Sequence, residues 1–105
     1  MGYYAMSDFM ELLFSERADA VHLHPGERPV LEVRRVLLVC PLEGPPLQAD
    51  ETEELLRGVA SDDDLSKFRS EGMVCFYFHF RGVAVFQVMG FRESGHIRLE
   101  VRRFR

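Results

Sequence analysis

The fold is decided by residues 73–104, which read MVCFYFHFRGVAVFQVMGFRESGHIRLEVRRF. Three runs rich in aromatic and β-branched residues are separated here by Arg81-Gly82 and by Glu93-Ser94-Gly95, and such short breaks are typical of tight turns. The stretch therefore predicts three strands, over residues 73–80, 83–91 and 96–104. Consecutive strands joined by short turns form an antiparallel meander.

Each strand of this meander has two different sides. In the last strand Ile97, Leu99 and Val101 alternate with three charged residues, so the two sets face opposite sides of the sheet. In the first strand Phe78 and Phe80 lie on one side. We expect both apolar sets to face the core.

Upstream of the meander the chain alternates between helical and strand patterns. Apolar residues at helical spacing follow Asp8 and Glu11, which together resemble a capping box. The turn of the expected hairpin falls at Arg34-Arg35, and Ser61 with Asp64 marks another helix start. The expected helices cover residues 7–17, 49–59 and a short segment from 61, and the expected strands cover 20–24 and a hairpin over 30–39. The order α-β-β-β-α-α-β-β-β predicts an α+β domain with its helices on one face of an antiparallel sheet.

Length and composition exclude several classes of protein. The 105 residues suit a single domain, residues 1–105, and 47% hydrophobic with 29% charged residues is typical of a folded globule. No uncharged run approaches the roughly 20 residues that a membrane-spanning helix needs, so we expect no membrane insertion and a cytoplasmic location. The net charge of −4 argues against nucleic-acid binding.

The pattern of basic residues argues against hydrolysis of nucleotides by this chain alone. Lys67 is the single lysine among 13 basic residues, and no glycine stands beside it. A phosphate-binding loop of the form G-x-x-x-x-G-K-[ST] is therefore missing. No G-x-S-x-G signature occurs either. We expect no enzyme activity, no catalytic residue and no cofactor.

Histidine and cysteine give two further expectations. His22 and His24 project from one side of a strand and would need a third ligand, from His79 or His96, to hold a metal. Two ligands are too few, so we predict polar residues on a solvated face and no metal site. Cys40 and Cys75 stand inside apolar runs and are expected to be buried, reduced thiols.

Charge is distributed unevenly along the chain. Residues 43–71 carry nine acidic and three basic side chains, whereas the end of the chain is basic. Arginine forks match carboxylates and phosphates, which makes the exposed arginines the candidate interaction residues. These candidates are Arg34, Arg35, Arg92, Arg98 and Arg102. The last three are expected to form a basic strip that favours an acidic partner surface, and reversing the charge of Arg98 and Arg102 is expected to weaken partner capture while leaving the fold intact.

Six short segments occur in an order that resembles one known family. They are ADAVHLHPG (18–26), PVLEV (29–33), GPPL (44–47), ETEELL (51–56), CFYF (75–78) and VFQVMGF (85–91). Together they resemble the N-terminal domain of the secretion ATPase superfamily, the PilT-like twitching-motility and type II secretion ATPases. The resemblance implies a PAS-like α+β domain attached to a RecA-like motor, in hexamers where it packs on the neighbouring subunit's motor domain. None of the motor's own motifs occurs in this sequence.

Departures from the family pattern shape the functional expectation. In the family, arginines of the last strands reach toward the nucleotide, and the aligned positions here are Val85, Gln87 and Ser94. The resemblance thus implies a domain that kept the fold and lost nucleotide sensing. We expect a non-catalytic interaction domain whose partner is a motor ATPase or a pilus or motility regulator. Two alternatives are a small-molecule sensor that uses the groove between sheet and helices, and a fragment of a hexameric motor in which Arg92 or Arg98 touches a neighbour's nucleotide.

Overall fold

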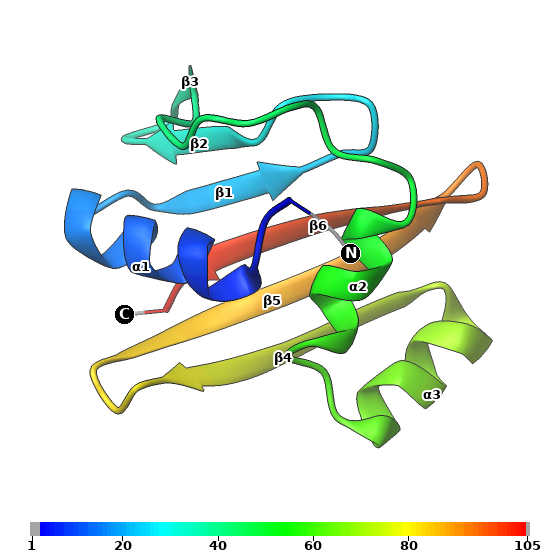
Figure 1. Ribbon diagram of the computed structural model, residues 1–105. Coiled ribbons are helices and arrows are strands. Elements are labelled where there is room, and N and C mark those ends of the chain that lie inside the picture. Colours follow the sequence, from blue (N-terminus) through cyan, green and yellow to red (C-terminus); the bar gives the residue numbers. More distant parts are fainter. Residues whose placement is uncertain (1–2, 105) are drawn as a thin grey trace.

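Three helices and six strands make up the computed structural model, which describes residues 3–104 (Figure 1). In chain order they are α1 (Met6–Glu16), β1 (Ala20–Leu23), β2 (Val30–Val33), β3 (Val36–Val39), α2 (Glu51–Arg57), α3 (Asp62–Glu71), β4 (Met73–Phe80), β5 (Ala84–Glu93) and β6 (His96–Arg103). The predicted α+β class and the predicted order of elements are both confirmed.

All six strands belong to one antiparallel sheet with the order β3-β2-β1-β6-β5-β4. The predicted meander forms one half of this sheet and the three N-terminal strands form the other. The halves meet where β1 pairs with β6, in a register that sets Val21 opposite Val101 and Leu23 opposite Leu99. The first and last strands are therefore central, and β3 and β4 are the two edges.

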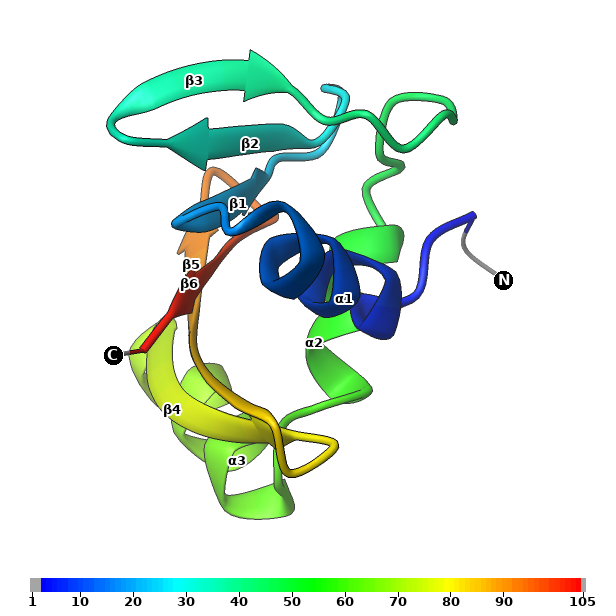
Figure 2. The same cartoon turned by 90° about the vertical axis from the view of Figure 1, so that its left-hand side faces the viewer.

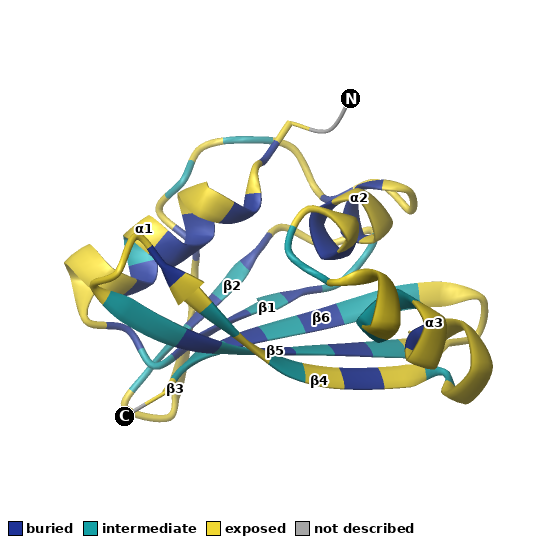
Figure 3. Cartoon of the chain, turned by 90° about the horizontal axis from the view of Figure 1, so that it is seen from below, coloured by how far each residue is buried: buried dark blue, intermediate teal, exposed yellow. Residues whose placement is uncertain are grey.

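The helices cover one face of the sheet. Figure 2 shows α1 and α2 on the concave side of the sheet, while α3 packs against β4. Phe9 and Leu13 of α1 and Leu56 of α2 are almost fully buried, as are Phe86 and Leu99 of the sheet beneath them. Because strand residues alternate between faces, buried and more exposed positions also alternate along β5 and β6 (Figure 3).

Alternation correctly assigned the inner face. Leu99 and Val101 are buried, Ile97 is partly buried, and Phe78 and Phe80 pack against the same core. The burial expected for Cys75 is wrong, although that of Cys40 is confirmed. Cys75 stands one residue out of phase with Phe78 and Phe80, so its thiol lies on the face that the helices leave open.

Local signals fix the helix ends. The hydroxyl oxygen of Ser61 accepts from the Asp64 amide and the Asp64 carboxylate accepts from the Ser61 amide, each at 3.1 Å, which confirms the capping box of α3. The start expected for α1 is different in the structure. Asp8 sits in the first turn, and its carboxylate accepts from the Ala5 amide at 3.0 Å, so Ala5 is the N-cap residue and Glu11 has no part in capping.

A buried carboxylate anchors the segment before α2. Glu51 is 5% exposed, and its two oxygens accept from the backbone amides of Tyr3 and Gln48, each at 2.9 Å. The hydroxyl of Tyr4 donates to the carbonyl of Pro45 at 2.9 Å. These bonds tie the N-terminal residues to the proline turn and hold α1 and α2 side by side over the sheet.

Candidate interaction surface

The face of the sheet opposite the helices is the first candidate surface, and we call it the uncovered face. Its half on β4 and β5 is mainly apolar: Met73, Cys75, Tyr77, Met89 and Phe91 lie there, beside the polar side chains of His79 and Gln87. Met73 is 53% exposed and Tyr77 52%. The Tyr77 ring meets the Phe104 ring edge to face, with 4.9 Å between centroids. Contiguous exposed apolar side chains of this kind mark protein-binding surfaces.

The other half of the uncovered face carries a charged network across β1, β2 and β6. Arg102 grips Glu32 with two guanidinium nitrogens, at 3.1 and 3.2 Å, and its Nε donates to Glu100 at 3.0 Å. His22 lies between the two carboxylates, with Nε2 2.9 Å from Glu32 and Nδ1 3.5 Å from Glu100. The network thus joins three strands by side chains as well as by backbone.

Proton affinities within this network follow from its geometry. Hydrogen bonds from Arg102, and then from His22, hold the pKa of Glu32 below its ordinary value, although burial acts in the opposite direction. The bond to Glu32 likewise raises the pKa of Arg102. Glu32 and Arg102 are therefore both charged at neutral pH, and each offsets the other's charge.

The arginine strip expected from the sequence does not form. Arg98 and Arg102 do share the uncovered face, but Arg92 pairs with Ile97 across the ladder and so points to the helix side, where its guanidinium stacks 4.8 Å from the Phe68 ring. Arg98 lies 4.2 Å from the Phe91 ring and 2.8 Å from the Glu93 carboxylate. Contact between these arginines and a partner stays a prediction.

The hairpin arginines have a different setting. Arg34 and Arg35 form the two-residue turn between β2 and β3, as predicted, and both adopt left-handed backbone conformations with φ of 51° and 68°. The Arg34 amide donates to the Asp19 carboxylate at 2.7 Å. Neither guanidinium makes an ion pair within residues 3–104, so both remain available to a partner.

Beside this turn lies a surface that the sequence reasoning missed. All four residues of β3 are apolar and exposed: Val36 56%, Leu37 64%, Leu38 47% and Val39 64%. The unbroken apolar run VLLV gives no sign of this exposure, because such a run is typical of a strand buried on both faces. The run predicted a strand but not its place at the edge of the sheet.

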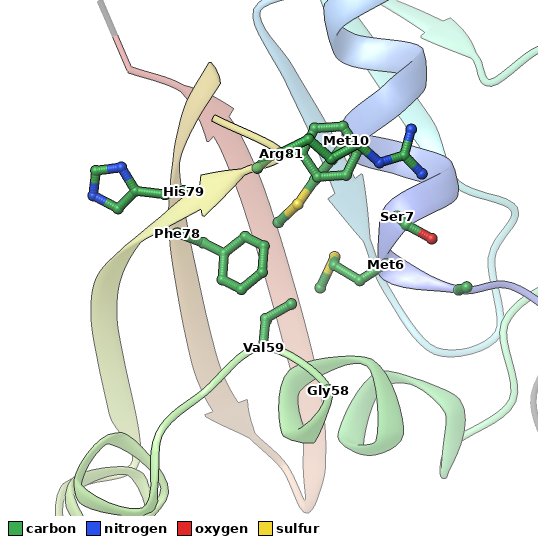
Figure 4. A pocket seen from close by; sticks show the side chains of 10 residues that line it. Met6, Ser7, Met10, Gly58, Val59, Phe78, His79 and Arg81 are labelled. Atoms are coloured by element: carbon green, nitrogen blue, oxygen red, sulfur yellow. The ribbon is translucent and has the colours of Figure 1, made fainter. Parts of the chain in front are cut away.

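A pocket of about 420 Å³ opens between α1, the end of α2 and β4 (Figure 4). The side chains of Met6, Val59 and Phe78 point into it, whereas His79 points away. At the rim, Arg81 lies 4.7 Å from the Phe80 ring and reaches toward Glu11 of α1 at 3.6 Å. The groove expected between sheet and helices therefore exists, and its walls are mainly apolar.

Neither a metal-binding cluster nor a membrane-spanning helix occurs among residues 3–104. Within the described part of the chain no three His, Cys, Asp or Glu side chains are grouped so that they could hold a metal ion. His22 is engaged by two carboxylates, as described above, while His24 follows the end of β1. Among residues 3–104 no helix combines the length and the apolarity needed to cross a bilayer.

Comparison with known proteins gives matches in structure. Neither a family model nor a curated protein sequence matches the chain. A crystal structure of the pilus retraction motor PilT with bound ADP is similar over 92% of this chain, with a TM-score of 0.75 and 26% identity. The ATPase DotB of Legionella pneumophila is similar over 97% (TM-score 0.75, 18% identity), and DotB of Yersinia pseudotuberculosis over 93% (TM-score 0.68, 16% identity).

The matched region is only part of those proteins, since this chain spans 27%, 30% and 29% of their respective lengths. Similarity therefore extends to one domain of each ATPase and nearly to the whole of this chain. The resemblance indicated by the sequence motifs is confirmed in structure: this chain has the fold of the N-terminal domain of the pilus and secretion ATPases.

Proposed function

We propose that this chain is a PAS-like, non-catalytic protein-interaction domain that binds a pilus or secretion motor ATPase, or a regulator of pilus-based motility. The observation that carries the proposal is the uncovered face. Half of that face is mainly apolar and exposed to solvent, and a contiguous exposed apolar patch on a folded domain typically marks a surface that binds another protein.

The two halves of the uncovered face suit different parts of a binding reaction. Burial of Tyr77, Met73 and Phe91 would supply affinity, because aromatic and methionine side chains dominate the centres of protein interfaces. The charged network beside them is internally neutralised and held by several bonds, so it offers a rigid, polar rim. Arg34 and Arg35, which make no ion pair with any other described residue, would attract an acidic partner surface.

The binding test uses the purified chain and the pilus or secretion motor ATPase encoded in the same genome, with affinity measured by calorimetry. Tyr77→Lys is expected to weaken binding by about tenfold or more, because a charge replaces the apolar centre of the interface. Phe14→Lys is the matched control, since Phe14 is 44% exposed but lies on α1, on the other side of the molecule. Equal effects of the two substitutions would overturn the role of the uncovered face, and no binding of the unaltered chain would overturn the motor ATPase as its partner.

The non-catalytic part of the proposal rests on the missing phosphate-binding loop and is tested separately. The chain with Mg-ATP is expected to release no phosphate and to show no micromolar heat of binding. Hydrolysis by the chain, or tight nucleotide binding, would contradict it. A reading frame that continues into a G-x-x-x-x-G-K-[ST] loop would instead favour the alternative of a hexameric motor, with Arg92 or Arg98 near a neighbour's nucleotide.

We also propose a cytoplasmic location. Cys40 and Cys75 are both free thiols, and Cys75 is exposed, which suits a reducing compartment. A fluorescent fusion that is retained with cytoplasmic markers on cell fractionation is the expected result. Recovery from the periplasm or the medium would contradict the proposal.

The pocket between helices and sheet supports a second candidate function, small-molecule sensing. Its volume of about 420 Å³ and its apolar walls suit a compact apolar ligand, with the exposed Arg81 at the rim for an anionic group. Ligand-observed NMR with a set of medium-chain fatty acids is the test. Binding should be lost in Val59→Trp, which fills the pocket, and kept in Val83→Trp, at an exposed residue outside that pocket.

A further inference from the structure

The edge strand β3 differs from the edges that soluble domains ordinarily present. It pairs with β2 on one side only, and its whole length is apolar and exposed. Natural proteins protect such edges with lysine, proline, a bulge or a covering segment, because an open edge pairs readily with another strand. None of these devices occurs within Val36–Val39.

The backbone of β3 presents a defined set of free hydrogen-bonding groups. Val33 and Val36 close the two-residue turn, and the Cys40 amide donates to the Pro29 carbonyl at 3.0 Å. Successive residues of an antiparallel strand alternate in the direction of their backbone hydrogen-bonding groups, so residues 36, 38 and 40 direct their amides and carbonyls toward β2. Leu37 and Val39 therefore direct theirs away from the sheet, along the open edge.

We propose that β3 pairs with β3 of a second copy of this chain, antiparallel and centred on Leu38. A two-fold axis perpendicular to the sheet places the helix sides of both copies on the same side of the joined sheet. Two residues that pair directly must then lie on the same face of β3, so their numbers are both odd or both even. Pairing Leu37 with Val39 of the other copy meets this requirement and satisfies the free groups of both residues in both copies. The result is a continuous sheet of twelve strands.

Side chains in this register complement one another on both faces. Leu38 meets Leu38 of the second copy across the axis on the helix side, and Leu37 lies beside Val39 of the second copy on the uncovered side. An aliphatic strand pairs favourably with another aliphatic strand, and here each copy covers the exposed apolar side chains of the other.

Charge complementarity favours a second copy over an unrelated strand. Antiparallel pairing brings the turn of one copy alongside residues 41–43 of the other. Within residues 3–104, Arg34 and Arg35 of that turn make no ion pair, and Glu43 is an exposed carboxylate in the segment they would meet. Two such contacts, related by the axis, would fix the register as well as the direction.

This inference goes beyond the proposed function and does not depend on it, because β3 lies at the opposite edge of the sheet from β4. A chain that fails to dimerise could still bind a motor ATPase through the uncovered face, and the reverse also holds. The two experiments therefore fail separately.

The first test is the mass of the full chain in solution, measured by sedimentation from micromolar to near-millimolar concentration. A monomer–dimer equilibrium is expected. Val39→Pro should weaken dimerisation about tenfold or more, since proline removes an outward amide without removing a bond to β2. Circular dichroism checks that this variant keeps its sheet. A monomer at every concentration would overturn the proposal and leave the edge for a different chain.

The second test fixes the register. Leu38 is placed opposite itself in a non-hydrogen-bonded pair, where Cα atoms lie about 4.5 Å apart, within the range of about 4.4–6.8 Å that a disulfide spans. In a Cys75→Ser background, Leu38→Cys should cross-link rapidly under a mild oxidant. Leu37→Cys is the matched control, more exposed than residue 38 yet opposite Val39 of the second copy, and should cross-link slowly. Equal rates, or faster cross-linking of the control, would contradict this pairing.

Discussion

Arg102 is the residue whose removal tests the reading of the charged network most sharply. Substitution by Met keeps much of the aliphatic stem and deletes the guanidinium. The three hydrogen bonds to Glu32 and Glu100 disappear, and two carboxylates, each 15% exposed, are left facing His22. Reversal of Arg98 and Arg102 was expected from the sequence to leave the fold intact, and the structure gives a different expectation for Arg102.

The size of the effect follows from the exposure of the groups. A hydrogen bond to a charged group is worth about 1.5–3 kcal/mol when buried, but Arg102 is 36% exposed and solvent screens its charge. We therefore expect the free energy of unfolding to fall by about 2 kcal/mol for the three bonds together. For a domain of this size that corresponds to a loss of about 10 °C in Tm.

Urea denaturation followed by circular dichroism measures this change. Arg57→Met is the matched control, because Arg57 and Glu53 form an ion pair at 3.8 Å with both side chains at least half exposed, and its loss should cost under about 0.5 kcal/mol. A double-mutant cycle of Arg102→Met with Glu32→Gln should show a coupling of about 1 kcal/mol. Equal destabilisation by Arg102→Met and Arg57→Met would refute the reasoning.

Three further expectations concern stability. The Thr52 hydroxyl is fully buried and, within the described structure, has no hydrogen-bond partner, so Thr52→Val should raise the free energy of unfolding by about 1 kcal/mol in the same urea assay. Because the pKa of Glu32 lies below its ordinary value of 4.5, the contribution of its carboxylate to stability is complete above pH 4.5 and is lost as the pH falls through the folded pKa. The difference in free energy of unfolding between the unaltered chain and Glu32→Gln should therefore shrink below about pH 4.5. A difference independent of pH would contradict this. Arg34→Asn combined with Arg35→Gly should stabilise the hairpin by about 1 kcal/mol, since asparagine and glycine adopt positive φ more readily than arginine. The same change should weaken any binding that depends on the two guanidinium groups. A lower Tm would count against backbone strain at this turn.

Local signals in the sequence were sufficient for most of the fold. The alternation of Ile97, Leu99 and Val101 identified the inner face of β6 because period-2 burial is a property of the strand itself. Ser61 and Asp64 marked the start of α3 because both partners of a capping box lie within one turn. The turn at Arg34-Arg35 was also found from its flanking apolar runs.

Relations between distant residues could not be predicted in the same way. Glu32 and Arg102 are 70 residues apart in the chain, and they meet only because β2 and β6 lie on either side of the same strand, β1. The face of Arg92 depends on the register of the last hairpin, which sets it opposite Ile97. The exposure of β3 depends on its place in the sheet, and no residue within the strand specifies that place.

The central pairing of β1 with β6 has a consequence for synthesis of the chain. Hairpins such as β2–β3 close within about 1–10 μs, but β1 cannot pair with β6 until β6 has been synthesised. At translation rates of about 5–20 residues per second, the N-terminal strands wait several seconds for that partner. Throughout this interval the hairpin that carries Val36–Val39 exists without the other half of its sheet. The nascent chain is therefore most exposed to misassembly before its last strand leaves the ribosome.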